Sequence, residues 1–252
     1  MKNKYGALAS LVYELDKPVG VSFGDVEYYL KRLQQIDGLI LEPGVGNGRF
    51  LIPLLKAGKS VVGLDSSEPM LAHARAALTK HQVSARLELN TFQGYQTDER
   101  YEAIVMPVGS FQLIDSFDTA TELLAHFRNM LSEKGRLLID IDPAHSIFLG
   151  EPSVRKWRLS PRDCVTLSTK RLAIDYVSQV TTELHRYELW EDGVLQKTEL
   201  EEFSLRWWGA NELALAFKVA GFTDIVISGG YEFSRKPSNE DSIITVEGVK
   251  KT

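Results

Sequence analysis

Short apolar runs alternate with stretches of helical periodicity between residues 39 and 141. The apolar runs predict strands at Leu39–Glu42, Ser60–Asp65, Ala85–Asn90, Tyr101–Met106 and Arg136–Ile141. The periodic stretches predict helices at Arg49–Ala57, Pro69–His81 and Thr119–Leu131. Continuous apolar strands that alternate with helices are typical of a parallel sheet covered on both faces. We therefore predict a doubly wound α/β fold. An earlier helix at Asp25–Gln35 is expected to cover the sheet or a site at its edge.

The pattern changes after Pro143. Residues 158–207 lack a helical period, are rich in Thr, Val, Tyr and Trp, and contain Glu191-Asp192-Gly193 between two β-like runs, which is typical of a hairpin. Helical spacing returns at Ala210–Ala220 and stops at Gly221, and two further strands are expected at Asp224–Ser228 and Ser242–Glu247. These elements predict a Rossmann-like, seven-stranded domain interrupted by an antiparallel β insert before the last helix. We assign an N-terminal helical lid to residues 1–36, the core to 37–150 and 209–252, and the insert to 151–208.

Charge and cysteine content narrow the class of protein. The 252 residues include 29 Lys and Arg against 34 Asp and Glu, a net charge of −5, which argues against binding driven by nucleic-acid phosphates. DNA is therefore not expected as a partner, and RNA is a weak alternative. Cys164 has no partner for a disulfide, which fits a reducing compartment. Glu14 and Asp16 interrupt the first apolar stretch, and no segment has the roughly 20 apolar residues that cross a bilayer. We expect a cytoplasmic protein without membrane association.

A glycine-rich loop follows the first predicted strand and leads into a helix. Gly44, Gly46 and Gly48 leave no Cβ in the way of a ligand, which would also meet a helix N-terminus. A dinucleotide site has the spacing Gly-x-Gly-x-x-Gly, but the third position here is Arg49 or Leu51. The spacing therefore disfavours a nicotinamide-dependent oxidoreductase, which we keep as an alternative. A plain tight turn is the alternative for the glycines.

An acidic residue ends the second predicted strand. Asp65 follows the apolar run Val61–Leu64 and lies 23 residues beyond Glu42 (65 − 42). A carboxylate at this place accepts two hydrogen bonds from a ribose diol in many nucleotide folds. The alternative is that Asp65 is the N-cap of the following helix.

These motifs resemble those of class I S-adenosylmethionine-dependent methyltransferases. The resemblance rests on an acid two residues before Gly-x-Gly-x-Gly and on Ser66-Ser67-Glu68-Pro69-Met70-Leu71 after the second acid. It implies that S-adenosyl-L-methionine is the cofactor. The residues that would bind it are Glu42, Gly44, Gly46, Gly48, Arg49, Asp65, Ser66, Met70, Asn90, Thr91, Phe92 and Met106.

The resemblance also implies separate parts for these residues. Glu42 and the glycines would hold the amino-acid end of the cofactor, and Met70 would pack on the adenine. Arg49 could pair with the cofactor carboxylate, or could lie on a solvated helix face. The chain departs from the family pattern because neither Asn90 nor Thr91 is acidic, and because Pro43 removes one backbone donor.

The segment after the fourth predicted strand limits the classes of methyl acceptor that we expect. Met106-Pro107-Val108-Gly109-Ser110-Phe111 lacks the Asn/Asp-Pro-Pro-aromatic motif of nucleic-acid amino-methylating enzymes, and offers no acid for a catechol-type magnesium site. It resembles the same segment of small-molecule methyltransferases, including enzymes that act on amino sugars. We therefore expect methyl transfer to N or O of a small molecule, with no metal. A non-catalytic S-adenosylmethionine-binding module is an alternative, and an exposed edge of the insert would allow a homodimer.

Two residues are candidates for catalysis. Tyr13 resembles the N-terminal aromatic that closes over the cofactor in related enzymes, or it anchors the lid. His145, which follows Asp140 and Asp142, could act as a general base because its ordinary pKa is near neutral, but ordering the turn at Pro143 is the favoured interpretation.

A functional role could be assigned to three further side chains, but we favour a structural interpretation of each. His185 lies two residues from Glu183, and we expect an exposed histidine rather than a metal ligand. Trp207 and Trp208 are expected to fill the core rather than line a pocket.

Overall fold

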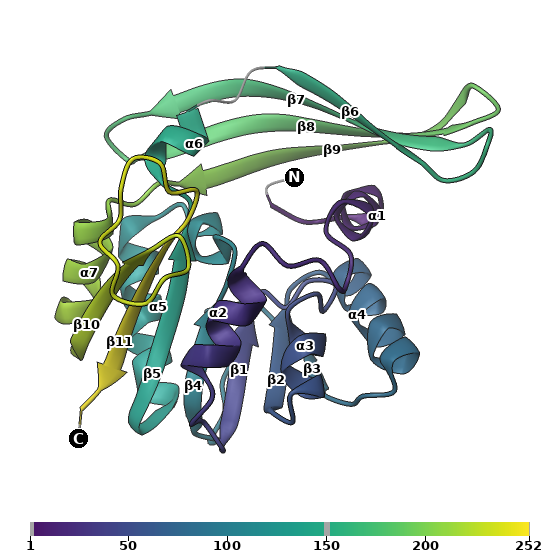
Figure 1. Ribbon diagram of the computed structural model, residues 1–252. Coiled ribbons are helices and arrows are strands. Elements are labelled where there is room, and N and C mark those ends of the chain that lie inside the picture. The colour runs from purple at the N-terminus through teal and green to yellow at the C-terminus, as the bar shows by residue number, and fades with distance from the viewer. Residues whose placement is uncertain (1–2, 149–151, 252) are drawn as a thin grey trace.

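The computed structural model describes residues 3–148 and 152–251 and contains a central seven-stranded sheet (Figure 1). The order of its strands is β10-β11-β5-β4-β1-β2-β3. Strands β3, β2, β1, β4 and β5 pair in parallel, whereas β11 is antiparallel to both of its neighbours. The predicted doubly wound α/β fold is confirmed. The strands are β1 (Leu39–Pro43), β2 (Ser60–Asp65), β3 (Arg86–Leu89), β4 (Tyr101–Met106), β5 (Leu131–Ile141), β10 (Phe222–Gly229) and β11 (Ile244–Lys250).

Helices cover both faces of this sheet. On one face lie α2 (Asp25–Arg32), α3 (Leu51–Lys56) and α4 (Glu68–His81), and on the other lie α5 (Phe117–Met130) and α7 (Ala210–Val219). Ile40 belongs to the hydrophobic cluster under the first set of helices and the adjacent Leu41 to the cluster under the second. Successive strand residues point to opposite faces, so a strand buried on both sides consists mainly of apolar residues.

The insert forms a separate four-stranded antiparallel sheet with the order β6-β7-β8-β9. Its strands are β6 (Ser153–Arg158), β7 (Cys164–Asp175), β8 (Val180–Glu191) and β9 (Val194–Arg206). The turn between β8 and β9 places Asp192 and Gly193 at φ of 47° and 77°. Two successive positive φ values are typical of a type I′ hairpin turn, which explains the sequence signal.

The insert sheet spans the end of the core at which β5 leads into α6 (Ala144–Phe148), as Figure 1 shows. Helix α1 (Ala7–Asp16) lies between this sheet and α4. Leu8 and Val12 of α1 share a buried cluster with Val165 and Leu167 of β7. The insert sheet and α1 therefore form a layer over the carboxyl ends of the core strands.

Several predicted boundaries differ from the structure. Strand β5 begins at Leu131 rather than Arg136, because Leu131 pairs with Tyr101 across a register shift. Helix α3 begins at Leu51 rather than Arg49, because the glycine loop continues to residue 50 and the side chain of Asn47 accepts a hydrogen bond from Arg49 N. Helix α2 packs into the core layer, and the assigned domain boundaries stay a prediction.

Core filling by tryptophan is confirmed at Trp208. Its side chain is 2% exposed, and its ring lies 5.6 Å from Phe111 and 5.7 Å from Phe117. Trp207 is also buried, with its ring 4.9 Å from Phe148. Among the described residues, no helix is both long and apolar enough to cross a membrane.

Candidate functional site

A cavity of about 270 Å³ opens where β1 and β4 end, the two neighbouring strands whose connections leave in opposite directions. Ligands of open α/β sheets bind at this switch point. We call it the first cavity. Its lining consists of Asn3, Tyr5, Tyr13, Gly44, Gly46, Asp65, Ser66, Met70, Thr91, Phe92, Gln93, Ser110, Leu113, Ile114, Asp115, Ser116 and Thr119.

The glycine loop folds over the edge of β2. Gly44, Gly46 and Gly48 have φ of 78°, 54° and 82°, values that disfavour any residue with a Cβ. Gly44 N donates a 2.7 Å hydrogen bond to Leu64 O. Gly44 and Gly46 line the first cavity, whereas a Cβ at Gly48 would lie 3.5 Å from Ala74 of α4. The first two glycines thus expose backbone to a ligand, and the third allows close packing of the loop on a helix.

Glu42 is buried beneath this loop. It is 1% exposed, and its Oε2 has no hydrogen-bond partner among the residues that the structure describes. Burial raises the pKa of the Glu42 carboxyl well above its ordinary value, with Asp25 and Asp65 adding to the effect and Arg49 opposing it. An unsatisfied buried acceptor is costly, so a cationic ligand group that reached Glu42 would be favoured.

Asp65 lies at the end of β2 with its carboxylate held by backbone amides. Its Oδ2 accepts a 2.9 Å hydrogen bond from Gly46 N and its Oδ1 one of 2.9 Å from Ser67 N. Each carboxylate oxygen can accept a further hydrogen bond, so both remain able to bind a diol. The N-cap of α4 is Ser67, whose Oγ accepts from Met70 N, so the alternative role of Asp65 as that cap is wrong.

The other predicted cofactor residues divide between the cavity and its surroundings. Ser66, Met70, Thr91 and Phe92 line the first cavity. Asn90 is exposed and lies outside the lining, with its Oδ1 accepting from Thr91 N. Met106 is fully buried in the core rather than at the cavity surface. The structure therefore brings the first four together and leaves the last two aside.

Tyr13 lines the first cavity from α1. Its ring meets that of Tyr5 edge-on at 6.1 Å, and Lys17 Nζ lies 5.3 Å from the ring centre. Burial raises the pKa of Tyr13 to about 12; Glu42, Asp65 and Asp25 also raise it, while Arg49 lowers it. The hydroxyl is therefore protonated at neutral pH, and it can donate a hydrogen bond but cannot serve as a base.

The N-terminal segment supplies lining residues that the sequence analysis missed. Tyr5 N donates to Glu201 Oε1 at 2.7 Å, and Ser67 Oγ donates to Tyr5 O at 2.7 Å. Asn3 Nδ2 donates to Ser204 O at 2.8 Å. These contacts join residues between 62 and 201 positions apart, so no local pattern in the sequence could have indicated them.

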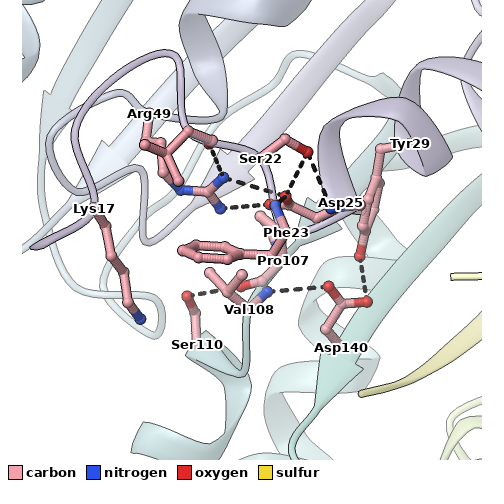
Figure 2. A network of polar contacts seen from close by, with 12 residues as sticks. Lys17, Ser22, Phe23, Asp25, Tyr29, Arg49, Pro107, Val108, Ser110 and Asp140 are labelled. Atoms are coloured by element: carbon pink, nitrogen blue, oxygen red, sulfur yellow. Dashed lines mark hydrogen bonds and ion pairs between the residues drawn. The ribbon is translucent and has the colours of Figure 1, made fainter. Parts of the chain in front are cut away.

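Arg49 does not line the cavity. Its guanidinium forms a buried ion pair with Asp25 (Figure 2). It also donates a hydrogen bond to Val21 O at 3.0 Å. The side chain is 3% exposed, so the expectation of a solvated helix face is wrong. Because both terminal nitrogens of the guanidinium already donate within the protein, we leave Arg49 out of the proposed cofactor contacts.

His145 lies on α6 and is exposed, outside the lining of the first cavity. We leave His145 out of the function proposed below, because it lines neither this cavity nor the second cavity next to α6. The preceding Asp140 is fully buried and accepts hydrogen bonds from Tyr29 at 2.9 Å, Tyr231 at 2.8 Å, Thr245 at 2.7 Å and Val108 N at 3.0 Å. Figure 2 shows the contacts from Val108 and Tyr29. Asp140 thereby joins α2, the β4 loop, β11 and the loop after β10.

Burial raises the pKa of Asp140 from its ordinary value of 3.8 to about 6, although all four hydrogen bonds oppose the shift. A raised folded-state pKa means that ionisation opposes folding. The contribution of Asp140 to stability is complete below about pH 4 and is lost as the pH rises through about 6, at a cost of about 3 kcal/mol. The free energy of unfolding in urea should fall when the pH rises from 5 to 7.5. This fall should be about 1 kcal/mol smaller in the Asp140→Asn variant than in the parent protein, because the variant has no carboxyl to ionise. Equal pH dependence in the two proteins would contradict this assignment.

A second cavity, of about 360 Å³, lies between the end of β5, α6 and the insert sheet. We call it the second cavity. Its lining consists of Asp142, Ser146, Ile147, Arg171, Thr181, Glu183, Phe203, Leu205 and Ser242.

A hydrogen-bonded group of charged side chains forms the insert side of the second cavity. Arg171 donates to Glu183 Oε1 at 2.8 Å, and His185 Nε2 lies 3.1 Å from Glu183 Oε2. The His185 ring stacks on Phe203 at 4.7 Å, so the expectation of an exposed histidine is wrong. No group of three or more potential metal ligands occurs in the described ranges.

Comparison with known proteins bears on the domain that holds the first cavity. Residues 40–135 match the model of a family described as "Methyltransferase domain". This stretch therefore resembles a methyltransferase domain, in agreement with the resemblance of its motifs to those of class I S-adenosylmethionine-dependent methyltransferases. The matched residues include Glu42, the glycine loop and Asp65. The putative methyltransferase YqeM of Bacillus subtilis (strain 168) is 28% identical over 111 residues, which cover 44% of this chain and 44% of YqeM. The match thus spans less than half the length of that relative.

Solved methyltransferase structures share the whole fold, including the insert. The sugar N-methyltransferase KedS8 from Streptoalloteichus sp ATCC 53650 superposes with a TM-score of 0.77 at 15% identity, covering 100% of this chain and 96% of KedS8. CalS10, an amino pentose methyltransferase from Micromonospora echinaspora whose structure contains S-adenosylmethionine, gives 0.68 at 17% identity, covering 98% and 99%. At these identities the likeness concerns the fold alone.

Proposed function

We propose that this protein transfers the methyl group of S-adenosyl-L-methionine to N or O of a small molecule. The observation that carries the proposal is the position of Asp65. Its carboxylate lines the first cavity beside the glycine loop, held by two backbone amides and with further acceptor capacity on both oxygens.

The first cavity offers a distinct environment to each end of this cofactor. The backbone of Gly44 and Gly46 lines the cavity at the place proposed for the amino-acid end. Glu42 lies under this loop and outside the lining, and its Oε2 lacks a partner that an ammonium reaching it would supply. Asp65 suits the ribose diol, and the apolar surfaces of Met70 and Phe92 suit the adenine. Asn90 and Met106 take no direct part in this assignment.

The cofactor, when bound, supplies an electrophilic methyl group on a sulfonium. The chain must then hold an acceptor in line with that group and keep water away. Tyr13 and Tyr5 line the first cavity, and the Tyr5 ring contacts that of Phe203, which lines the second cavity. We place the acceptor in the second cavity, whose Ser146, Thr181 and Ser242 can hydrogen-bond a small polar molecule.

The relatives support this choice of acceptor class by analogy. KedS8 is described as a sugar N-methyltransferase and CalS10 as an amino pentose methyltransferase. Both have this fold, and both names indicate a small polar acceptor. A cytoplasmic location and a homodimer formed through the insert remain proposals made from the sequence.

Two measurements separate this function from its alternatives. S-adenosylhomocysteine, and not NADH, should raise the melting temperature, because only the ligand that binds the native state stabilises it. Incubation with methyl-labelled cofactor and a metabolite extract should label a small molecule. Stabilisation by NADH alone would favour an oxidoreductase, and stabilisation by S-adenosylhomocysteine without any labelled product would favour a non-catalytic module.

A further inference from the structure

The first and second cavities meet at a short series of contacts. The ring of Tyr5 in the first cavity lies 6.2 Å from the ring of Phe203 in the second. A Cβ at Gly44 would lie 3.2 Å from Ser110 Oγ, and a Cβ at Gly109 would lie 3.2 Å from Asp142 Oδ2. The glycine loop therefore adjoins the segment after β4, and that segment adjoins Asp142. Asp142 lines the second cavity and is the acidic residue that lies where the two cavities meet.

The backbone of Asp142 is fixed in place. Asp142 N donates to Gln112 Oε1 at 2.7 Å, and Gln112 Nε2 donates to Asp142 O at 3.3 Å. Gln112 itself is fully buried. The Gln112 carboxamide hydrogen-bonds both the N–H and the C=O of Asp142, so the position from which the Asp142 side chain extends is fixed. A binding group requires such a fixed position.

The carboxylate of Asp142 is not used in holding the fold together. It accepts no hydrogen bond from any side chain or amide within the described part of the chain, and it is half-buried at the surface of the second cavity. Burial raises its pKa, and the nearby Lys17 opposes the shift. A partly desolvated carboxylate without a donor gains more from a bound cation than a solvated one does.

We propose, on the basis of the function proposed above, that Asp142 binds the amino group of the acceptor and makes this protein an N-methyltransferase. The amine binds as an ammonium, loses one proton to water, and then donates a hydrogen bond to Asp142 with its lone pair toward the first cavity. The nitrogen lone pair forms the new N–C bond, and the C–S electron pair stays on sulfur. The positive charge thus moves from sulfur to nitrogen, where Asp142 stabilises it. The product ammonium later loses a proton to solvent.

Lys17 contributes to the same step as a charged neighbour of this carboxylate. Its side chain is half-buried, interacts electrostatically with Asp142, and lies beside the Tyr13 ring. A second positive charge close to the site disfavours the ammonium form of the acceptor relative to the neutral amine. Lys17 therefore favours the form that has a lone pair to attack.

Calorimetry with a matched pair of probes tests the proposal. Cyclohexylamine and cyclohexanol differ only in the group offered to Asp142, and each is titrated into protein saturated with S-adenosylhomocysteine. Asp142→Asn keeps the shape and removes the charge, whereas Asp98→Asn removes one charge from an exposed site. We expect Asp142→Asn to weaken cyclohexylamine binding by about tenfold or more, the effect of one charge-assisted hydrogen bond, and cyclohexanol binding by less than about twofold.

The outcomes separate this proposal from the one on which it rests. If S-adenosylhomocysteine binds all three proteins but Asp142→Asn binds cyclohexylamine as tightly as Asp98→Asn does, the role of Asp142 is overturned while the proposed function stands. Absence of saturable cyclohexylamine binding to the parent protein has the same meaning. Failure of S-adenosylhomocysteine to bind the folded parent protein overturns the proposed function, and this proposal with it.

Discussion

Replacing Asp65 by alanine is expected to weaken S-adenosylhomocysteine binding by about 100-fold or more. The two ribose hydroxyls would each lose a hydrogen bond to a charged acceptor, and each such bond contributes about 1.5–3 kcal/mol. Isothermal titration calorimetry measures the loss directly. The exposed Asp98 provides the matched substitution, and Asp98→Ala should bind the ligand as the parent protein does.

A structural effect of the Asp65 substitution can be recognised separately. Asp65 also accepts hydrogen bonds from Gly46 N and Ser67 N, so its removal loosens the glycine loop. Asp65→Asn retains one acceptor oxygen and the side-chain shape, and it should bind with an affinity between those of the parent and Asp65→Ala. If Asp65→Ala binds S-adenosylhomocysteine normally, the assignment of the ribose to this carboxylate is wrong.

The largest effect on stability is expected for Arg49→Met. The change should lower the free energy of unfolding by about 3–5 kcal/mol, because it leaves Asp25 as a buried charge without its partner. Asp25 is fully buried, and Phe23 N donates a 3.0 Å hydrogen bond to its Oδ1. Urea unfolding at neutral pH measures the loss.

The pH dependence of this defect has a definite sign. Burial raises the pKa of the Asp25 carboxyl, but the hydrogen bond and charge of Arg49 outweigh it, so the folded-state pKa lies below the ordinary 3.8. The ion pair therefore stabilises the fold above about pH 4, and this contribution disappears as the pH falls through the folded-state value. The difference between Arg49→Met and the parent should accordingly shrink in acid.

An exposed ion pair serves as the control for Arg49. Arg75 and Glu68 form a salt bridge on α4 with side chains that are 49% and 56% exposed. Arg75→Met should lower the free energy of unfolding far less than Arg49→Met does, because solvent screens exposed pairs. Equal losses for Arg49→Met and Arg75→Met would contradict the view that burial makes the first pair important.

The sequence predicted the strands in which most residues are apolar and buried. The strands Ser60–Asp65 and Tyr101–Met106 have the predicted boundaries because four and five of their six residues, respectively, are buried. The glycine loop and Asp65 were predictable because their chemistry is encoded by local spacing, and the structure places both at the first cavity. Local order in the sequence therefore sufficed for the frame of this site.

The sequence failed where a side chain acts through a distant partner. Arg49 pairs with Asp25, which is 24 positions away and belongs to no motif. His145 has suitable chemistry in a suitable stretch of sequence, but the orientation of α6 leaves it exposed. The importance of Asp142 emerges only when the insert closes the second cavity over it. Such residues are defined by tertiary contacts that no periodicity records.

A crystal structure of the protein with S-adenosylhomocysteine tests the central assignment most directly. The account predicts both ribose hydroxyls within about 3 Å of the Asp65 carboxylate oxygens, and the ligand's ammonium close to Glu42 and the backbone of Gly44. A ligand bound elsewhere, or a ribose in the first cavity that makes no contact with Asp65, would contradict it.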